Sequence, residues 1–204
     1  MNKPLEIETD PSGFRLELHL DDSNDFNPLI EFSSFGTLVC WHRRSNLGHK
    51  NIVHQEELAD IIPKDAIKLP VYLYEHSGMT VSLEPFGDPW DSGQVGWIFV
   101  TREKVLEEYS VKKITPQVRE KVLAVFRAEI EIYDAYLRGE VYGYVVRSPE
   151  GDNLDSCWGF FGESKYCMEE GRASLRAEVE NRTQSNEIER GRAAQAAQEN
   201  VATV

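Results

Sequence analysis

The sequence predicts an α+β fold, in which a mostly antiparallel β-sheet carries one long helix, at about residues 115–138, on one face. Three observations support this fold class. Short segments of alternating or β-branched apolar residues recur between turn formers, as strands do. One longer segment instead repeats its apolar residues about every 3.6 positions, the period of an amphipathic helix. Residues 148–153 are rich in turn formers and separate two strand-like segments, which is typical of a hairpin.

The strands are predicted from local patterns. Residues 14–20 alternate apolar and polar side chains, as in a half-buried strand. Residues 96–100 are apolar on both faces, so that strand should lie at the centre of the sheet. Further strands are predicted at 35–42, 69–74, 79–83, 141–146 and 154–162.

The helices are predicted from end signals and periodicity. Thr115 is a good N-cap for the long helix, Pro116 suits its first turn, and Gly139 ends it. Thr101 caps a shorter helix that reaches Tyr109. Two more helical segments are predicted at 55–62 and 163–180.

The domain organisation follows from composition. Residues 1–13 are polar and are expected to be flexible, and residues 14–180 form a single α+β domain. From about residue 181 large apolar side chains almost vanish. Residues 181–204 are therefore expected to be a polar tail, either disordered or helical only on a partner or a second copy. Such a tail leaves room for a homo-oligomer.

The loop at residues 85–93, PFGDPWDSG, is unlike a plain turn. It combines two aromatic rings with two acids, two prolines and two glycines, so we expect Phe86 and Trp90 to be buried on the protein or on a partner. The most basic stretch, residues 41–54, contributes a second set of candidates. The predicted partner-binding residues are Phe86, Asp88, Trp90, Asp91, Arg43 and Arg44.

Charge and cysteine content narrow the possible partners. A formal net charge of -13 disfavours direct nucleic-acid binding and suits basic partners, including the nucleic-acid-binding faces of other proteins. Three cysteines without a C-x-x-C pair indicate a reducing compartment, so the cytoplasm is expected. The sequence shows neither a secretory signal nor an apolar run that could span a membrane.

Two groups of residues could carry chemistry. His76, Asp88, Asp91 and Ser92 could supply a base, an orienting carboxylate and a nucleophile, although loop hydrogen bonds explain them as well. Cys40, His42, His49 and His54 could hold zinc, but their spacing matches no standard site.

Other chemical signals are weak. Cys157 lies on an apolar segment, which is more typical of an inert buried thiol than of a nucleophile. The sequence contains no P-loop, no G-x-G-x-x-G and no H-E-x-x-H, so no cofactor is expected.

Several strings in residues 27–162 together resemble a widespread uncharacterised family encoded by bacteriophages and mobile elements. PWDSGQVG at 89–96 and SCWGF at 156–160 are the most distinctive of them. The resemblance implies a viral or mobile-element origin and an accessory role in the host cytoplasm, but no activity. His49 stands where similar proteins carry an acid, which weakens any metal site there.

Together these observations favour a non-enzymatic accessory protein that binds and inhibits a host defence protein. Its acidic surface would compete for a basic nucleic-acid site. The alternative is a hydrolase or nuclease-like enzyme that uses His76, Asp88 and Asp91. A third hypothesis is a structural component that oligomerises through its tail.

Overall fold

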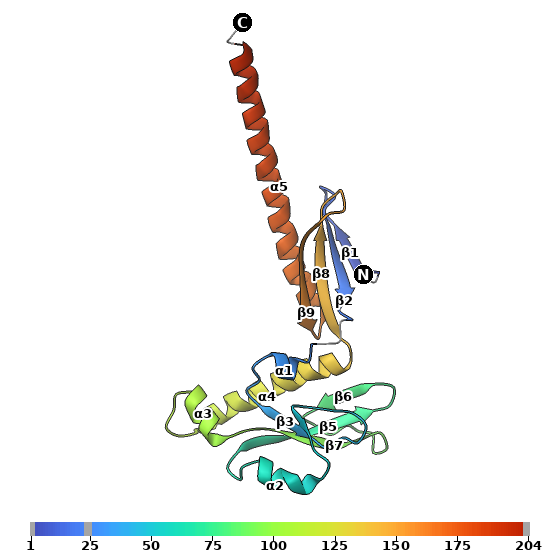
Figure 1. Ribbon diagram of the computed structural model, residues 1–204, viewed down its shortest axis with the longest axis vertical. Coiled ribbons are helices and arrows are strands. Elements are labelled where there is room, and N and C mark those ends of the chain that lie inside the picture. Colours follow the sequence, from blue (N-terminus) through green and yellow to red (C-terminus); the bar gives the residue numbers. More distant parts are fainter. Residues whose placement is uncertain (1–2, 23–25, 202–204) are drawn as a thin grey trace. The chain divides into compact units, whose positions relative to one another are not determined.

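Two segments far apart in the sequence pair to form the first sheet. The computed structural model describes residues 3–22 and 26–201, with side chains through residue 195. The chain divides into two compact units: unit 1 comprises Met1–Asp22 and Val141–Val204, and unit 2 comprises Ser23–Glu140. Both appear in Figure 1.

The sequence predicted one domain over residues 14–180. The division follows from packing, because each unit has its own sheet and its own apolar cluster.

Unit 1 is an antiparallel sheet with a helix on one face (Figure 1). Its strands lie in the order β1-β2-β8-β9. Their bounds are β1 (Glu6–Thr9), β2 (Arg15–Leu20), β8 (Val141–Arg147) and β9 (Asn153–Phe161), and the helix is α5 (Ser164–Val201). The first half of α5 packs on the sheet, with Met168 and Leu175 against Leu16 and Tyr144. Gly171 permits this approach, because an added Cβ would lie 2.5 Å from Leu16 Cδ1.

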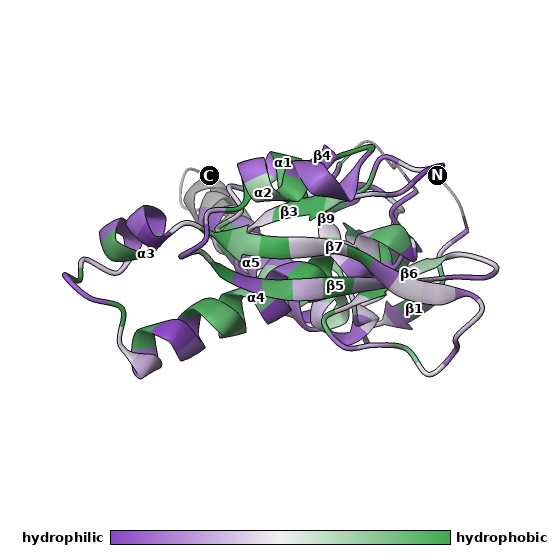
Figure 2. Cartoon of the chain, turned by 90° about the horizontal axis from the view of Figure 1, so that it is seen from below, coloured by the Kyte–Doolittle hydropathy of each residue, from purple (hydrophilic) through white to green (hydrophobic). Residues whose placement is uncertain are grey.

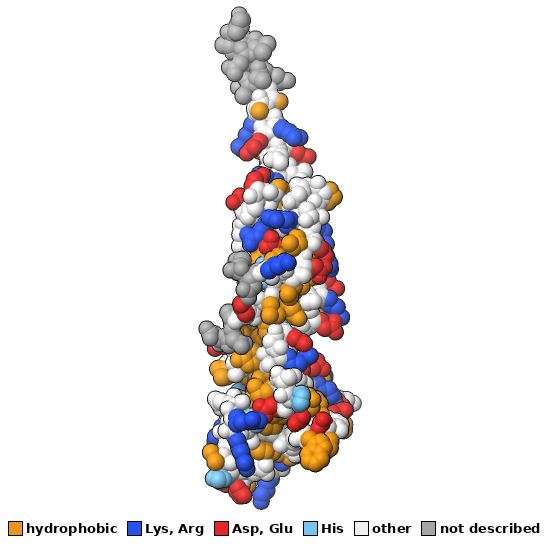
Figure 3. Space-filling model, turned by 90° about the vertical axis from the view of Figure 1, so that its right-hand side faces the viewer, with side chains coloured by type: hydrophobic (Ala, Val, Ile, Leu, Met, Phe, Trp, Pro, Cys, Tyr) orange, Lys and Arg blue, Asp and Glu red, His pale blue; other side chains and the backbone are white. Residues whose placement is uncertain are grey.

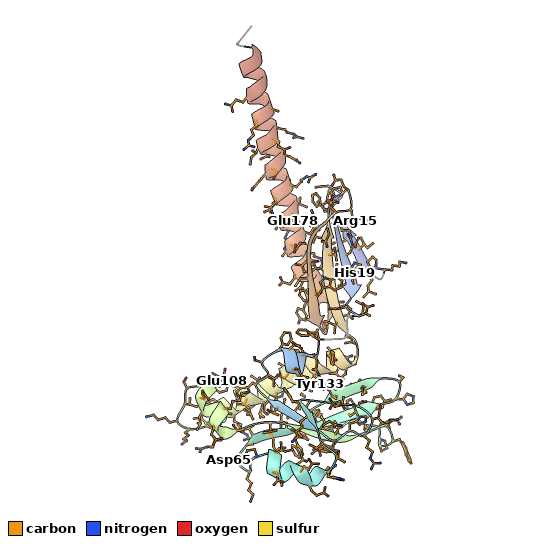
Figure 4. All side chains as sticks on the ribbon, viewed as in Figure 1. Arg15, His19, Asp65, Glu108, Tyr133 and Glu178 are labelled. Atoms are coloured by element: carbon orange, nitrogen blue, oxygen red, sulfur yellow. The ribbon has the colours of Figure 1, made fainter. Side chains whose placement is uncertain are left out.

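Ion pairs complete unit 1. Arg172 Nε on α5 donates to Glu8 Oε2 on β1 at 2.9 Å. On the sheet face opposite α5, Glu17 Oε2 accepts from Arg147 Nε at 2.8 Å, and His19 Nε2 lies 3.3 Å from the same oxygen. Figure 4 labels His19 on β2. Glu17 and His19 are both buried, so these contacts lie in the interior of unit 1.

Unit 2 holds a five-stranded sheet in the order β4-β3-β7-β5-β6. The strands are β3 (Thr37–Cys40), β4 (Lys50–Asn51), β5 (Ile67–Glu75), β6 (Met79–Ser82) and β7 (Ser92–Val100). All neighbours are antiparallel except the short β3–β4 pair. β7 lies at the centre, as its apolar sequence predicted, and contributes the fully buried Ile98 to the core.

Helices cover both faces of the unit 2 sheet (Figure 1). The long helix α4 (Pro116–Leu137) lies on one face, and its side chains Val122, Phe126, Ile130 and Tyr133 are buried in the larger core. The short α2 (Leu58–Ile61) lies on the other face, over a smaller cluster that contains Val39 and Phe99. Figure 2 shows the apolar central strands of this sheet. The remaining helical segments are α1 (Pro28–Glu31), a 3-10 turn at Gln55–Glu57 and α3 (Arg102–Glu108).

The predicted ends of α4 agree with the structure. Thr115 Oγ1 accepts from the Val118 amide, and Gly139 has a φ of 68°, which L side chains rarely adopt. Tyr133, labelled in Figure 4, reaches from α4 to the strand layer, where its hydroxyl accepts from the Gly48 amide at 2.9 Å. The observed α4 and the two mostly antiparallel sheets confirm the predicted α+β class.

Unit 2 is inserted between two neighbouring strands of unit 1. β2 precedes it and β8 follows it, and these strands pair directly, with Leu20 opposite Tyr142. The Asp21 amide continues the ladder by donating to the Val141 carbonyl at 2.8 Å. The chain therefore leaves and re-enters unit 1 at paired positions.

The chain ends differ from expectation. Residues 1–13 were expected to be flexible, but Glu6–Thr9 forms β1 because it completes the sheet edge and pairs with β2. For residues 181–204, expected to be disordered or helical only on a partner or a second copy, α5 continues through Val201, while positions 1–2 and 202–204 of the predicted end segments lie outside the described residues. Every described side chain from 180 to 195 is exposed. Within the described residues, no helix has the length and apolarity that a membrane span requires.

Candidate functional site

The loop between β6 and β7 is held by one carboxylate. Asp88 Oδ1 accepts from the amides of Trp90, at 2.8 Å, and Asp91, at 3.0 Å. These two hydrogen bonds lower the pKa of Asp88. The Ser92 hydroxyl donates to the Asp88 carbonyl. The alternative of loop hydrogen bonds, raised for these residues from the sequence, is therefore present, and it is Asp88 that bonds the loop amides.

The two rings of the loop have different surroundings. Phe86 is half-buried and lies 5.8 Å from the Tyr74 ring, centroid to centroid. Trp90 is 92% exposed, so the expectation that its ring is buried on the protein is wrong. The Asp88 carboxylate holds the Trp90 backbone in a turn, and the indole is exposed to solvent. Because tryptophan is enriched at interface hot spots, an exposed indole on a braced turn marks a candidate interaction site.

Asp91 connects the loop to the end of β5. Its carbonyl accepts from the Glu75 amide at 2.9 Å, and its carboxylate oxygen Oδ2 lies 2.9 Å from His76 Nδ1. Of the predicted group of His76, Asp88, Asp91 and Ser92, the structure thus brings His76 and Asp91 into direct contact. Both side chains are well exposed, at 67% for His76 and 40% for Asp91. Water consequently screens this pair.

Strand order explains why these groups gather at one edge. β7 begins at Ser92, beside the place where its antiparallel neighbours β3 and β5 end. Residues that follow β3, such as His42 and Arg44, therefore reach residues at the end of β5. Arg44 Nη2 donates to Glu75 Oε2 at 2.7 Å, and His42 Nε2 lies 3.4 Å from the same oxygen. The Ser45 amide donates to His42 Nδ1, which assigns the ring proton to Nε2.

These side chains surround an open cleft of about 300 Å³. Leu73 and Val95 belong to its lining, together with the two tryptophans Trp41 and Trp90. We call this region the Trp90 surface and define it as Trp41, His42, Arg44, Glu75, Trp90 and Asp91. Figure 3 looks toward this end of the unit 2 sheet, where hydrophobic side chains lie at the surface beside acidic and basic ones. A second cleft, of about 520 Å³, shares Trp41 and His42 and is also lined by Arg43 and His54.

The structure thus brings together most of the residues predicted to bind a partner. Arg44, Trp90 and Asp91 line one cleft, and Arg43 lines the adjoining one. Asp88 supports the loop from behind, and Phe86 anchors it on Tyr74. Trp41 and Glu75 were not among the six residues predicted to bind a partner. The signal that could have identified them is strand pairing. Trp41 follows β3 and Glu75 ends β5, and both strands flank the start of β7.

The four candidate zinc ligands do not form a common site within the described residues. Cys40 is buried in the α4-side core, and burial raises the pKa of its thiol to about 12. His49 Nδ1 accepts from the Leu38 amide, whereas His42 and His54 line the second cleft. No three His, Cys, Asp or Glu side chains of the described chain are grouped as a metal site would need.

The geometry for nucleophilic catalysis is incomplete. The Ser92 hydroxyl, the predicted nucleophile beside His76, is engaged by the Asp88 carbonyl. Cys157 is exposed rather than buried, because it lies on the edge strand β9 of unit 1. Comparison with family models, curated proteins and solved structures returned no match for this chain.

Proposed function

We propose that the protein is a non-enzymatic accessory protein that docks onto a partner protein through the Trp90 surface. The observation that carries this proposal is the 92% exposure of Trp90 on a loop whose backbone is fixed by Asp88. Tryptophan and arginine dominate binding energy at protein interfaces, and a rigid loop loses little conformational entropy on binding. The Trp90 surface offers both residue types beside an apolar lining.

In its concrete form, the proposal is that the partner is a nucleic-acid-handling protein of a bacterial host's defence, in the host cytoplasm. The net charge of -13 supports it, because an acidic protein is attracted to a basic nucleic-acid site and can compete for it. The resemblance to bacteriophage and mobile-element proteins points the same way. In this proposal the Trp90 surface supplies the short-range contacts, and the acidic charge steers the encounter.

The test is capture from a nuclease-treated bacterial lysate, with Trp90→Ala compared against Tyr166→Ala. Tyr166 is an exposed aromatic residue of unit 1, 55% exposed, and so controls for the loss of any surface ring. Trp90→Ala should weaken capture of a specific protein by about thirtyfold, as at an interface hot spot. Equal capture by both variants would contradict the proposal.

A salt series separates charge mimicry from docking. If nucleic-acid mimicry contributes, the affinity for the captured partner should collapse as ionic strength rises past about 0.15 M, because screening shortens the reach of the acidic surface. Affinity that does not change with salt would remove the mimicry and leave the docking proposal intact.

The alternative function is a hydrolase or nuclease-like activity, and the observation that favours it is the 2.9 Å contact between His76 and Asp91. The variants His76→Ala and Asp91→Asn are each compared with the wild type. An enzyme would lose activity on a nucleic-acid or ester substrate while remaining folded and partner-bound. If the wild-type protein docks onto its partner but shows no such activity, this alternative is eliminated.

A further inference from the structure

The cleft of the Trp90 surface has a specific chemical character. Two indole rings, those of Trp41 and Trp90, line it together with the carboxylates of Glu75 and Asp91. Leu73 and Val95 add apolar lining. An aromatic face attracts cations through its quadrupole, and a nearby carboxylate can bind the cation's hydrogen-bond donors.

The two carboxylates are not equivalent. Glu75 Oε2 already accepts from the Arg44 guanidinium at 2.7 Å and has His42 Nε2 at 3.4 Å, so its charge is compensated. Within the described part of unit 2, the Asp91 carboxylate has one side-chain partner, His76, which contacts Oδ2. Asp91 Oδ1 is therefore the acceptor that remains for a ligand. It lies on the same loop as the exposed Trp90 ring.

The sheet of unit 2 already contains one contact of this kind. Lys68 Nζ lies 4.6 Å from the centroid of the Trp97 ring, within the range of a cation–π interaction. The cleft volume of about 300 Å³ is at the lower end of the range for ligand pockets, so it suits one side chain rather than a large ligand.

From these observations we propose that the cleft between Trp41 and Trp90 binds one arginine or lysine side chain of the partner. The cationic group stacks on the Trp90 indole and donates to Asp91, and its aliphatic stem lies along Leu73 and Val95. This inference rests on the proposed function and names the chemistry by which the surface recognises a basic partner.

The probe is N-acetyl-arginine amide, and N-acetyl-citrulline amide serves as its neutral isostere. The four tryptophans provide four indole N–H resonances for NMR, and Trp90→Phe assigns that of Trp90. Titration with the arginine amide should shift the Trp90 and Trp41 resonances with a dissociation constant in the millimolar range. The Trp97 and Trp158 resonances should stay fixed. Citrulline amide should bind at least about threefold more weakly.

Two variants separate charge from apolar contact. Asp91→Asn keeps the shape of the side chain and should weaken arginine binding by about threefold, whereas Trp90→Leu keeps an apolar side chain and should weaken it at least as much. Tyr166→Ala should leave the titration unchanged. Equal binding of the arginine and citrulline amides, or no shift of the Trp90 resonance, would overturn the proposal.

The outcomes also distinguish this inference from the proposed function. If Trp90→Ala abolishes capture of a partner but the arginine amide does not bind, docking stands and the cation site is eliminated. If the arginine amide binds with the expected variant effects but Trp90→Ala leaves capture unchanged, the cation site stands and the docking proposal fails.

Discussion

Asp88 lies at the start of the turn that carries Trp90, and its carboxylate accepts both amide hydrogens of that turn. The side chain contributes nothing to the lining of the neighbouring cleft. Its role in recognition is therefore indirect, through the position of the Trp90 backbone. A residue of this kind affects binding through rigidity, because an ordered loop loses less entropy when the partner arrives.

We predict that Asp88→Ala frees the turn, whereas Asp88→Asn largely preserves it because the amide oxygen can still accept. Hydrogen exchange of the Trp90 and Asp91 amides should accelerate by about tenfold in Asp88→Ala. Partner capture should weaken although every residue of the Trp90 surface is unchanged. Unaltered exchange in Asp88→Ala would show that the turn holds without its carboxylate.

Tyr133 provides a second test at the scale of one residue, this time of stability. Its hydroxyl accepts from the amide of Gly48, a residue with a φ of 73° at which an added Cβ would lie 2.7 Å from the Leu38 carbonyl oxygen. Both Gly48 and Tyr133 are buried. Burial raises the pKa of the Tyr133 hydroxyl to about 12, so it stays protonated at neutral pH.

Tyr133→Phe should leave the Gly48 amide without its acceptor and lower the free energy of unfolding by about 1–3 kcal/mol. Urea denaturation measures the change. Tyr136→Phe is the matched control, because Tyr136 lies on the same helix and is only partly buried. A loss of the same size in both variants would show that the hydrogen bond to Gly48 contributes little.

At the scale of elements, α5 has two halves with different environments. Its first half buries Cys167, Met168 and Leu175 on the unit 1 sheet, whereas every described side chain from 180 to 195 is exposed. An unpacked polar helix of this length is marginal in water, so its stability depends on continuity with the packed half.

Chains ending at Arg182 and at Ser174 should therefore behave differently. The first keeps all the buried residues of α5 and should change the free energy of unfolding by less than about 0.5 kcal/mol. The second removes Leu175 and the packing of Val179 and should cost about 2–5 kcal/mol. Light scattering also tests whether the tail drives oligomerisation. If it does, the chain ending at Arg182 should form smaller oligomers than the full chain, with fewer copies per particle.

Local sequence patterns were enough to predict most elements. They did not reveal which distant segments pair with one another. Period-two alternation in residues 14–20 and the capped, periodic segment at 115–138 encode β2 and α4 directly. The segment Glu6–Thr9 has one apolar residue, Ile7, and its alternation is too short to predict a strand, so β1 depends on its ladder to β2 and on Arg172. The insertion was equally hidden, since the pairing of β2 with β8 spans all of unit 2.

The candidate site divides in the same way. The composition of residues 85–93 identified the loop, and the sequence grouped His76 with the acids of this loop, of which Asp91 is the one that His76 contacts. The hydrogen bonds that hold the Trp90 turn are made by Asp88, but from the sequence alone they could have been assigned to any of several acids. Trp41 and Glu75 joined the site only through the order of strands in the sheet.

At the scale of the whole molecule, the partly buried Glu129 of unit 2 responds to pH in the opposite direction to three carboxylates of unit 1, whereas Asp88 on the exposed loop of unit 2 has a lowered pKa like theirs. In unit 1 the Arg172 side chain lowers the pKa of Glu8, and the Ser174 hydroxyl lowers that of Asp155. Burial alone would raise the pKa of Glu17, but hydrogen bonds from Arg147 and His19 outweigh it and the pKa is lowered. In unit 2, burial raises the pKa of Glu129, although the amides of Phe35 and Gly36 partly oppose this.

The direction in which stability changes with pH follows from proton linkage. A lowered carboxyl pKa stabilises the fold above the group's ordinary pKa, and that contribution is lost as pH falls through the lowered value. A raised carboxyl pKa contributes stability at low pH that is lost as pH rises through the raised value. Below about pH 4, unit 1 should therefore lose stability before unit 2.

Amide resonances of the two units, followed by NMR during acid titration, provide the measurement. Loss of native β2 and β8 signals should precede loss of native β7 signals, and Glu129→Gln should remove the contribution that unit 2 gains on acidification. Simultaneous loss of both sets of signals would contradict independent responses of the units.

The insertion of unit 2 between paired strands also has a mechanical consequence. A force applied to the two ends of the chain reaches unit 2 only through β2 and β8, and the ladder from Arg15–Arg147 to Leu20–Tyr142 holds these two strands together. While that ladder holds, both connections of unit 2 stay side by side and no tension crosses it. Unit 2 is thus shielded from the force. Mechanical unfolding that separates the strands of unit 1 would extend unit 2, with its Trp90 surface, last.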